Sequence, residues 1–416
     1  MTVPVLASAG ASMGPAPDDL ARWTAADRSA RPARLDRLRE RMTRGGVDAY
    51  FAVGRENIRY LTGFALADGE EKVAGNSGRT LVSADEVVVL ADSRYTIQAH
   101  EEAPDARVEP CDYDLAARWE ALVASLRSGR SRRSRRVRRV AVEAAILPHA
   151  TWTAIAEAAP QVELVAADGW VEERRQVKEP AEVERIATAC RLGDAALEAL
   201  RPRITPGTTE RELAWELEAW LRTHGAEALA FDVAVLGGER AALPHGSPGD
   251  RPIRAGEVLL IDFGAQVAGY RSDMTRTLFV GQPSSRDLAL YELVLRAQNA
   301  AVERLEVAVR SGEPVSGREV DRAARRVIEE AGHGELFGHN TGHGIGLATH
   351  ELPGLRRTGP ELPLPAPTVF SVEPGVYLEG ETGVRIEDLA VYDPDAGRLE
   401  RLTRFPRGVT VIAPGR

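Results

Sequence analysis

The stretch IDFGAQVAGYRSDMTRT, residues 261–277, decides the fold of the C-terminal half of this 416-residue chain. It continues an apolar run, VLLI, which is typical of a strand buried on both faces. Gly264 and Gly269 indicate the turn region, so the stretch predicts a hairpin. Because the two strands of a hairpin pair with each other, we expect the carboxylates of Asp262 and Asp273 to lie close together.

A second pair of acidic residues has a similar sequence context. Glu373 lies in FSVEPGVY (370–377), where a β-branched run is stopped by a proline and a glycine. Glu387 follows in VRIED (384–388), which has the pattern of a returning strand. We expect a second acidic hairpin that faces the first and completes a cage of carboxylates.

His343 adds an imidazole to these four acids. It lies in GHNTGHGIGLATHE (338–351), whose glycines leave little side-chain bulk and predict a close approach of the backbone to a bound ion or ligand. A single aspartate at a strand end is usually a turn cap or a solvated charge. Four converging carboxylates differ, because buried carboxylates repel one another and lose hydration unless cations neutralise them. Bridging and terminal ligands of these types suit a pair of divalent cations, so the set predicts a two-metal site.

Together these stretches resemble metallopeptidase family M24, which contains methionine aminopeptidase, prolidase and Xaa-Pro aminopeptidase, and the resemblance points to the Xaa-Pro branch. It implies a pita-bread catalytic domain that holds two divalent metal ions, with Mn²⁺ expected first and Co²⁺ or Zn²⁺ as alternatives. It also implies that Asp262 binds one metal, that His343 and Glu373 bind the other, and that Asp273 and Glu387 bridge the two.

The same resemblance implies a catalytic set around the metals. His245, His339 and His350 are expected to line the substrate site, and Arg385 to hydrogen-bond near a bridging water. Two divalent cations lower the pKa of such a water enough to supply hydroxide near neutral pH. Glu373 is the expected proton shuttle to the proline nitrogen, which has no N–H of its own. His350 or His245 is expected to donate a hydrogen bond to the developing oxyanion.

The expected substrate is a peptide with proline in the second position, cut by an Xaa-Pro aminopeptidase. Strict prolidases often carry an arginine four residues after the histidine that matches His350, where this chain has Gly354. Arg356 and Arg357 lie close by and could replace it, so an Xaa-Pro dipeptidase is an alternative. Ala348 stands where relatives often carry an acid, which leaves the orientation of His350 open. A same-fold hydrolase of a non-peptide C–N bond is a further alternative, whereas the complete ligand set argues against a non-catalytic binding module.

The N-terminal half shows the alternation of strands and helices that is typical of a three-layer α/β domain. We expect a helix at 32–45, a strand at 48–53, and further elements at 57–64 and 86–103. The motif DSRYT (92–96) resembles the creatinase/prolidase N-terminal domain. The predicted fold class is therefore α/β (α+β), with a three-layer α/β domain followed by a pita-bread domain.

Three segments are predicted along the chain: a disordered extension at 1–30, the creatinase/prolidase-like domain at 31–168 and the pita-bread catalytic domain at 169–416. The linker lies near 166–180 and opens a helix at 181–200. Thr209 and Glu212 then predict a capping box at the start of an amphipathic helix.

Composition narrows the class of function. The net charge of −9 argues against general affinity for nucleic acid. The segment RSGRSRRSRRVRR (127–139) is rich in arginine but lacks aromatic residues for base stacking, so it predicts a solvated surface loop. The chain has only two cysteines, which favours a reducing cytoplasm. The first 20 residues lack a basic leader, and no apolar run is long enough to span a membrane. The family resemblance implies a homodimer.

Overall fold

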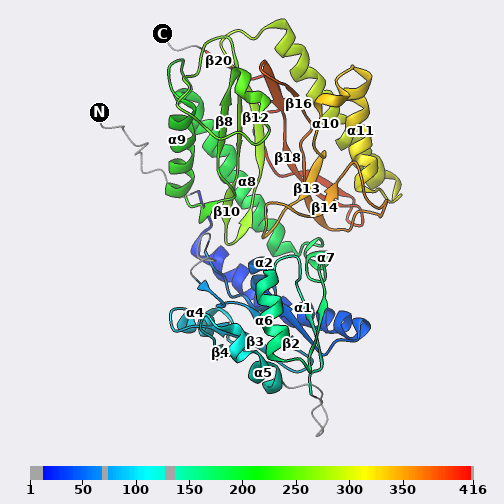
Figure 1. The fold of residues 1–416 in the computed structure, drawn as a ribbon. Coiled ribbons are helices and arrows are strands. Elements are labelled where there is room, and N and C mark those ends of the chain that lie inside the picture. Colours follow the sequence, from blue (N-terminus) through cyan, green and yellow to red (C-terminus); the bar gives the residue numbers. More distant parts are fainter. Residues whose placement is uncertain (1–12, 68–73, 127–135, 414–416) are drawn as a thin grey trace, which may run out of the picture. The chain divides into compact units, whose positions relative to one another are not determined.

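The computed structural model describes residues 13–67, 74–126 and 136–413 (Figure 1). The chain divides into two compact units. One is Ala21–Arg175, and the other contains Gln176–Arg416 together with the residues before Ala21. None of the helices among the described residues combines the length and apolar character that a membrane-spanning helix needs.

The unit Ala21–Arg175 is built around one mixed sheet. Its strands run in the order β4-β3-β2-β1-β5-β6, with β5 parallel to β1 and β6, β4 parallel to β3, and β2 antiparallel to its two neighbours. The strands are β1 (Ala49–Ala52), β2 (Thr80–Ser83), β3 (Val87–Ala91), β4 (Arg107–Pro110), β5 (Arg139–Val142) and β6 (Glu163–Ala166). Among the described residues, the helices are α1 (Pro17–Gly45), α2 (Arg55–Thr62), α4 (Thr96–Glu102), α5 (Leu115–Ser125), α6 (His149–Ala158) and α7 (Glu172–Arg175). The predicted alternation of strands and helices is confirmed.

The core of this unit joins the sheet to helices that follow it in sequence. Trp119 of α5 packs edge-on against Phe51 of β1, with ring centroids 5.0 Å apart. Val88 and Val140 of the sheet and Ile155 of α6 belong to the same buried cluster. Burial of whole aromatic and branched side chains of this kind is the main stabilising contribution to such a domain.

The predicted disordered extension at 1–30 is wrong for its described second half. Helix α1 runs from Pro17 to Gly45, so it begins well before the expected start at Pro32, which lies inside it. Pro17 and two aspartates in the first turn favour a helix start there. Trp23, only 2% exposed, anchors the added turns by burial. Residues 1–12 lie outside the described residues.

The predicted surface loop at 127–139 is tested only at its end. Residues 127–135 lie outside the described residues, and Arg139 is the first residue of β5 rather than part of a loop. Its guanidinium pairs with Glu163 on the neighbouring strand β6 at 2.9 Å. The cross-strand partner explains why a charged residue begins this strand.

The C-terminal unit contains two larger sheets flanked by helices. One sheet has the strand order β20-β12-β9-β8 and the other the order β14-β13-β15-β18-β19. Their strands are β8 (Ala234–Gly237), β9 (Val258–Phe263), β12 (Met274–Val280), β20 (Val411–Ile412), β13 (Gly342–Gly344), β14 (Glu351–Leu355), β15 (Thr368–Val372), β18 (Asp388–Asp393) and β19 (Arg398–Arg401). Smaller sheets are formed by β7 (Ala228–Leu229), β10 (Ala265–Val267) and β11 (Tyr270–Arg271), and by β16 (Gly375–Leu378) and β17 (Thr382–Arg385).

The helices of this unit are α8 (Pro180–Leu200), α9 (Glu210–Thr223), α10 (Ser285–Ser311) and α11 (Gly317–Glu330), with short 3-10 turns η1 (Arg201–Arg203), η2 (Gly238–Ala242) and η3 (Gly334–Leu336). Figure 1 shows α9 beside β8, and α10 and α11 together on the other side of the strands. One core packs Val294 of α10 and Ile328 of α11 against Leu260 of β9 and Phe370 of β15. The helices therefore fix the two sheets relative to each other.

The predicted start of α9 and the first hairpin are confirmed. Thr209 and Glu212 form the expected capping box at α9. Strands β9 and β12 pair antiparallel, with Asp262 opposite Thr275. The turn lies at Ala268 and Gly269, whose φ angles are 46° and 85°.

Gly264 has a different role from the predicted one. It lies between β9 and β10 rather than in the turn. A Cβ at this position would collide with the carbonyl oxygen of Ser272 on the returning chain. Glycine is therefore required because the two backbones approach closely where the hairpin passes from one sheet to the next.

We expect Gly264→Ala to destabilise the protein by about 3 kcal/mol, because the backbone of Ser272 has to move. The measurement is urea unfolding of the two proteins. Gly408→Ala is the matched control, since nothing lies within 4 Å of a Cβ there and its change should stay within about 0.5 kcal/mol. Equal stabilities for the two variants would contradict the close approach.

Candidate metal centre

The four predicted acids lie at the ends of paired strands. Asp262 is in β9 and Asp273 immediately precedes β12, while Glu373 follows β15 and Glu387 precedes β18. Strands β15 and β18 pair antiparallel, with Val372 opposite Asp388. The two pairs are joined, because the amide of Glu387 donates to the carbonyl of Thr275 at 3.1 Å. The expected two acidic hairpins are therefore adjacent.

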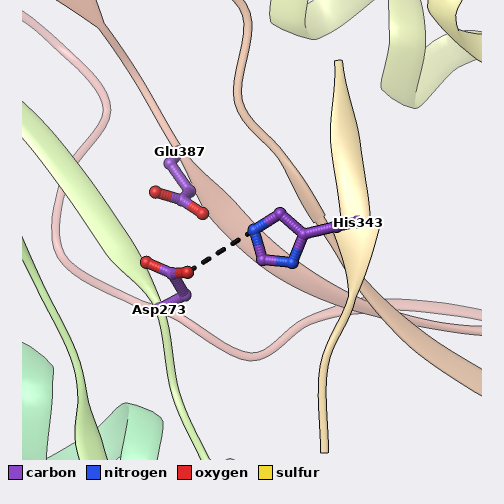
Figure 2. A group of neighbouring side chains, drawn as sticks. All are labelled: Asp273, His343 and Glu387. Atoms are coloured by element: carbon purple, nitrogen blue, oxygen red, sulfur yellow. Dashed lines mark ion pairs between the residues drawn. The ribbon is translucent and has the colours of Figure 1, made fainter. Parts of the chain in front are cut away.

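His343 lies on β13, between β14 and β15, and its ring faces the acids. Figure 2 shows His343, Asp273 and Glu387 converging from three separate segments of the chain. His343 Nε2 lies 3.6 Å from Asp273 Oδ2 and 3.2 Å from Glu373 Oε1. Nδ1 of the same ring donates to the carbonyl of Gly344 at 3.1 Å, which leaves Nε2 toward the carboxylates.

The donor set fits divalent cations. Ligand atoms of Asp273, His343 and Glu387 all lie within 4.8 Å of one another. Asp262 Oδ1, Asp273 Oδ1 and Glu387 Oε1 are buried and have no hydrogen-bond partner among the described residues. Buried carboxylate oxygens without partners are costly, and a shared cation would satisfy all three.

The closeness of the acids changes the pKa values of the metal-free site. Burial, with the charges of Glu373 and Asp262, raises the pKa of Glu387 to about 8. Burial and the charge of Glu387 raise the pKa of Asp273 well above its ordinary value. Burial alone would lower the pKa of His343, but its hydrogen bond and ion pair with Glu373 raise it to about 9. Protons thus occupy this cage in the absence of cations.

The pKa of Glu373 shifts in the opposite direction to those of Asp273 and Glu387. Burial would raise the pKa of Glu373, but the hydrogen bond and charge of His343 lower it to about 2. The Ser371 hydroxyl also donates to Glu373 Oε1 at 2.9 Å. Glu373 is therefore an oriented carboxylate at the edge of the cage.

Arg385 links the cage to the predicted substrate side. It pairs with Asp262, donates from Nε to the Thr275 hydroxyl at 2.9 Å and donates from Nη1 to the Tyr377 hydroxyl at 2.8 Å. Thr275 in turn donates to Glu387 Oε2 at 2.7 Å. Arg385 therefore orients one carboxylate directly and a second one through Thr275.

The hydrogen bonds of His339 define its tautomer. Its Nδ1 donates to the Asn340 carbonyl at 2.8 Å, and burial lowers its pKa, so the ring is neutral. Its Nε2 therefore accepts from the Tyr377 hydroxyl, 2.9 Å away. Because Arg385 can only donate, a directed chain runs from Arg385 through Tyr377 to His339.

The other two predicted histidines are exposed. The His350 ring lies beside that of His343, with ring centroids 4.2 Å apart. His245 follows η2. Burial raises the pKa of Asp262, and the nearby charge of His245 opposes that rise; burial lowers the pKa of His350, and the charge of His245 adds to that lowering. Both rings are thus available on the open side of the cage.

Sequence reasoning missed Tyr377 and Thr275. Thr275 could have been found, because it stands two residues after Asp273 and alternate residues of a strand share a face. Tyr377 carried a weaker signal, as the aromatic end of FSVEPGVY. Its phenol is buried, which raises its pKa to about 12.

The glycines around His343 have a different role from the predicted one. A Cβ at Gly342 would collide with the Ser371 carbonyl, and one at Gly344 with the Leu352 carbonyl. These glycines therefore let β13 pack closely against β15 and β14.

The side chain of Arg356 lies where a side chain at position 354 would otherwise be. Gly354 is the cross-strand partner of His343. A Cβ at Gly354 would lie 2.6 Å from Arg356 Cγ and 2.7 Å from Arg356 Cδ. The Arg356 side chain therefore fills the space above Gly354, on the strand that neighbours His343.

Comparison with protein-family models matches both units. The model of metallopeptidase family M24 matches residues 184–393, and the model of the creatinase/prolidase N-terminal domain matches residues 34–177. The "Uncharacterized peptidase YqhT" of Bacillus subtilis is 31% identical over 379 residues, which cover 91% of this chain and all of that protein. An Xaa-Pro dipeptidase of Pyrococcus horikoshii is 39% identical over 241 residues, 58% of this chain and 66% of that protein.

Solved structures share the fold over most of the chain. An Xaa-Pro dipeptidase from Bacillus anthracis has a TM-score of 0.80 and 32% identity, covering 91% of this chain and 99% of that one. An X-Pro aminopeptidase from Thermotoga maritima has a TM-score of 0.78 and 34% identity, with the same coverage of both chains. The predicted fold class is confirmed, and the likeness does not separate dipeptidase from aminopeptidase.

We expect Mn²⁺ binding to the metal-free protein at pH 7 to release about one to two protons per chain, because Glu387 and His343 hold protons there. Since both pKa values lie above 7, metal affinity should rise from pH 6 to pH 9. The measurement is titration calorimetry in buffers of equal pH but different protonation enthalpies. Binding heats that do not depend on the buffer would contradict the protonated cage.

Proposed function

Because this chain belongs to metallopeptidase family M24, we propose that it is a metal-dependent hydrolase that removes the N-terminal residue from peptides with proline in the second position. The observation that carries the proposal is the buried cage of four carboxylates and His343, in which three oxygens have no partner among the described residues. Carboxylate oxygens are the ligands that hard divalent cations prefer.

The ligands divide into terminal and bridging positions in this proposal. Asp262 holds one cation, and His343 with Glu373 holds the other. Asp273 and Glu387 would contribute oxygens to both, with Mn²⁺ as the expected metal. Divalent ions at this site would polarise the scissile carbonyl and make water acidic.

Glu373 is the proposed proton shuttle. Its carboxylate is held by Ser371 and His343 at 2.9 and 3.2 Å, so it presents a fixed acceptor for the proton of the attacking water. The C–N bond then breaks as that proton passes to the proline nitrogen, which leaves as a neutral secondary amine. The delivered proton is essential, because the nitrogen of the broken amide bond can leave as a neutral amine only after it gains a proton.

The histidines act on the carbonyl side of the reaction. His350 and His245 are exposed beside the cage, and either can donate a hydrogen bond to the oxygen on which negative charge develops. Arg385 and Tyr377 keep Asp262 and His339 in fixed orientations. These contacts hold the polar groups in place before the substrate arrives.

An Xaa-Pro dipeptidase is the second candidate, and Arg356 favours it. Its side chain occupies the space over Gly354, opposite His343, and no ion pair or hydrogen bond of its guanidinium is found among the described residues. A free guanidinium at the edge of the site would suit the C-terminal carboxylate of a dipeptide. A homodimer and a cytoplasmic location stay predictions.

We expect metal-reconstituted protein to hydrolyse Ala-Pro-Ala, Ala-Pro or both, and to leave Ala-Ala-Ala intact, because the proposed substrates carry proline in the second position. Removal of metal with a chelator should abolish turnover, and Mn²⁺ should restore it. The measurement is release of free alanine by mass spectrometry. Full activity of the metal-free protein would reject the mechanism. If neither proline peptide is hydrolysed, a substrate with a non-peptide C–N bond is favoured.

The variant Arg356→Met tests whether the enzyme prefers a dipeptide or a longer peptide. We expect its KM for Ala-Pro to rise about tenfold, because a charge-assisted hydrogen bond to the dipeptide carboxylate is lost. Its KM for Ala-Pro-Ala should stay unchanged, since that carboxylate lies one residue further away. Arg357→Met is the matched control and should alter neither value. A dipeptide KM that stays the same in Arg356→Met would exclude the clamp.

A further inference from the structure

His350 is a side chain whose position depends on its neighbours in sequence. Among the residues that the structure describes, its ring makes no hydrogen bond, and its ring contact is with His343. Its ring is exposed, so packing does not fix it either. The placement of His350 beside the cage is therefore set by the main chain on both sides of it.

The residue before His350 is anchored to a different part of the unit. The Thr349 hydroxyl donates to the Ala230 carbonyl at 3.0 Å and accepts from Arg271 Nη1 at 3.3 Å. The amide of Arg271 also donates to the carbonyl of Gly346 at 2.9 Å. The loop that leads to His350 is thus tied to the tip of the first acidic hairpin.

The residue after His350 is anchored by a buried ion pair. Lys178 Nζ lies 2.8 Å from Glu351 Oε1, and the two side chains are 1% and 5% exposed. The amide of Lys178 donates to the Pro367 carbonyl at 2.8 Å, so the lysine backbone is also fixed. A buried ion pair of this kind tolerates little movement, because two opposite charges attract strongly where water is excluded.

The ion pair also lies directly against the loop. A Cβ at Gly346 would collide with Glu351 Oε1 and would lie 3.2 Å from Lys178 Cε. The amide of Ala348 donates to the other oxygen, Glu351 Oε2, at 3.4 Å. The carboxylate of Glu351 therefore contacts the lysine on one side and the loop backbone on the other.

We propose that Lys178 and Glu351 are positioning residues that hold His350 at the open side of the metal cage. The inference rests on the proposed function, in which His350 donates to the developing oxyanion. Relatives often carry an acid where this chain has Ala348. In this proposal Glu351 takes the place of that acid in orienting His350. Neither Lys178 nor Glu351 contacts the substrate in this proposal.

A double-mutant cycle with His350→Ala tests the inference. We expect Lys178→Met to lower kcat for the hydrolysed proline peptide about 10- to 100-fold with KM little changed, because small displacements of an acting group cost this much. In the His350→Ala background the same change should cost less than about twofold, since the positioned group is absent. An equal loss in both backgrounds would overturn the proposal.

Two further variants keep the test valid if Lys178→Met does not fold. Glu351→Gln keeps the shape of the side chain, and Gly346→Ala displaces the pair without removing either charge. Both should show the same dependence on His350. Glu306→Gln is the matched control, because its partner Arg310 forms an exposed ion pair and no rate should change. Metal content, measured for each variant, should equal that of the unchanged protein.

A readout without turnover separates this inference from the proposed function. If the unchanged protein cleaves no proline peptide, the proposed function fails, and the ring of His350 is then observed directly. We expect folded Lys178→Met to shift the histidine Cε1–H NMR signal that is lost in His350→Ala, while Glu306→Gln leaves it in place. An unmoved signal in folded Lys178→Met would overturn the positioning role.

Discussion

Mutual repulsion of four carboxylates, two of them buried and two half-buried, is the constraint on which the rest of this structure depends. Without cations the cage is balanced by protons and by two positive side chains, Arg385 against Asp262 and His343 against Glu373. Such a balance holds only if the surrounding backbone cannot relax and let the acids separate. The scaffold provides this resistance behind the cage, where Arg276 is 1% exposed.

Arg276 and Asp388 join the two acidic hairpins. Arg276 donates to the carbonyls of Thr275 and Glu387 and pairs with Asp388 at 2.7 Å. Asp388 also accepts from Thr403 at 2.7 Å and from Gln298 of α10 at 3.1 Å. A fully satisfied buried network of this kind holds a single arrangement of the backbone. The ligands on β12 and β18 are therefore fixed as one body.

The loops that carry His245, His339 and His350 are also held by buried charged side chains. Near His339, Arg325 of α11 pairs with Asp321 at 2.9 Å and donates to the His339 carbonyl at 2.8 Å. Around His245, the buried carboxylate of Glu210 accepts from the amides of Gly237 and Gly249, both at 2.9 Å. Each exposed or half-buried histidine thus depends on a buried charge outside the cage, which keeps polar groups preorganised for a charged transition state.

The sequence was most informative where a local pattern of residues is compatible with only one structure. The apolar run before Asp262 predicted the hairpin, and the convergence of acids with His343 predicted the cage. Gly264 and Gly342 were misread, because local sequence cannot show which distant backbone lies against a glycine. The first turns of α1 were missed for a similar reason, since the burial of Trp23 comes from tertiary packing. Tyr377 and the Lys178–Glu351 pair depend on contacts between distant segments that spacing alone does not reveal.

The central claim is that five residues hold two divalent cations in one cage. The most direct measurement is anomalous X-ray diffraction from crystals of the full chain grown with Mn²⁺. The account predicts two anomalous peaks, one at Asp262 and one at His343 and Glu373, with Asp273 and Glu387 between them. A single peak, or peaks outside this cage, would contradict it.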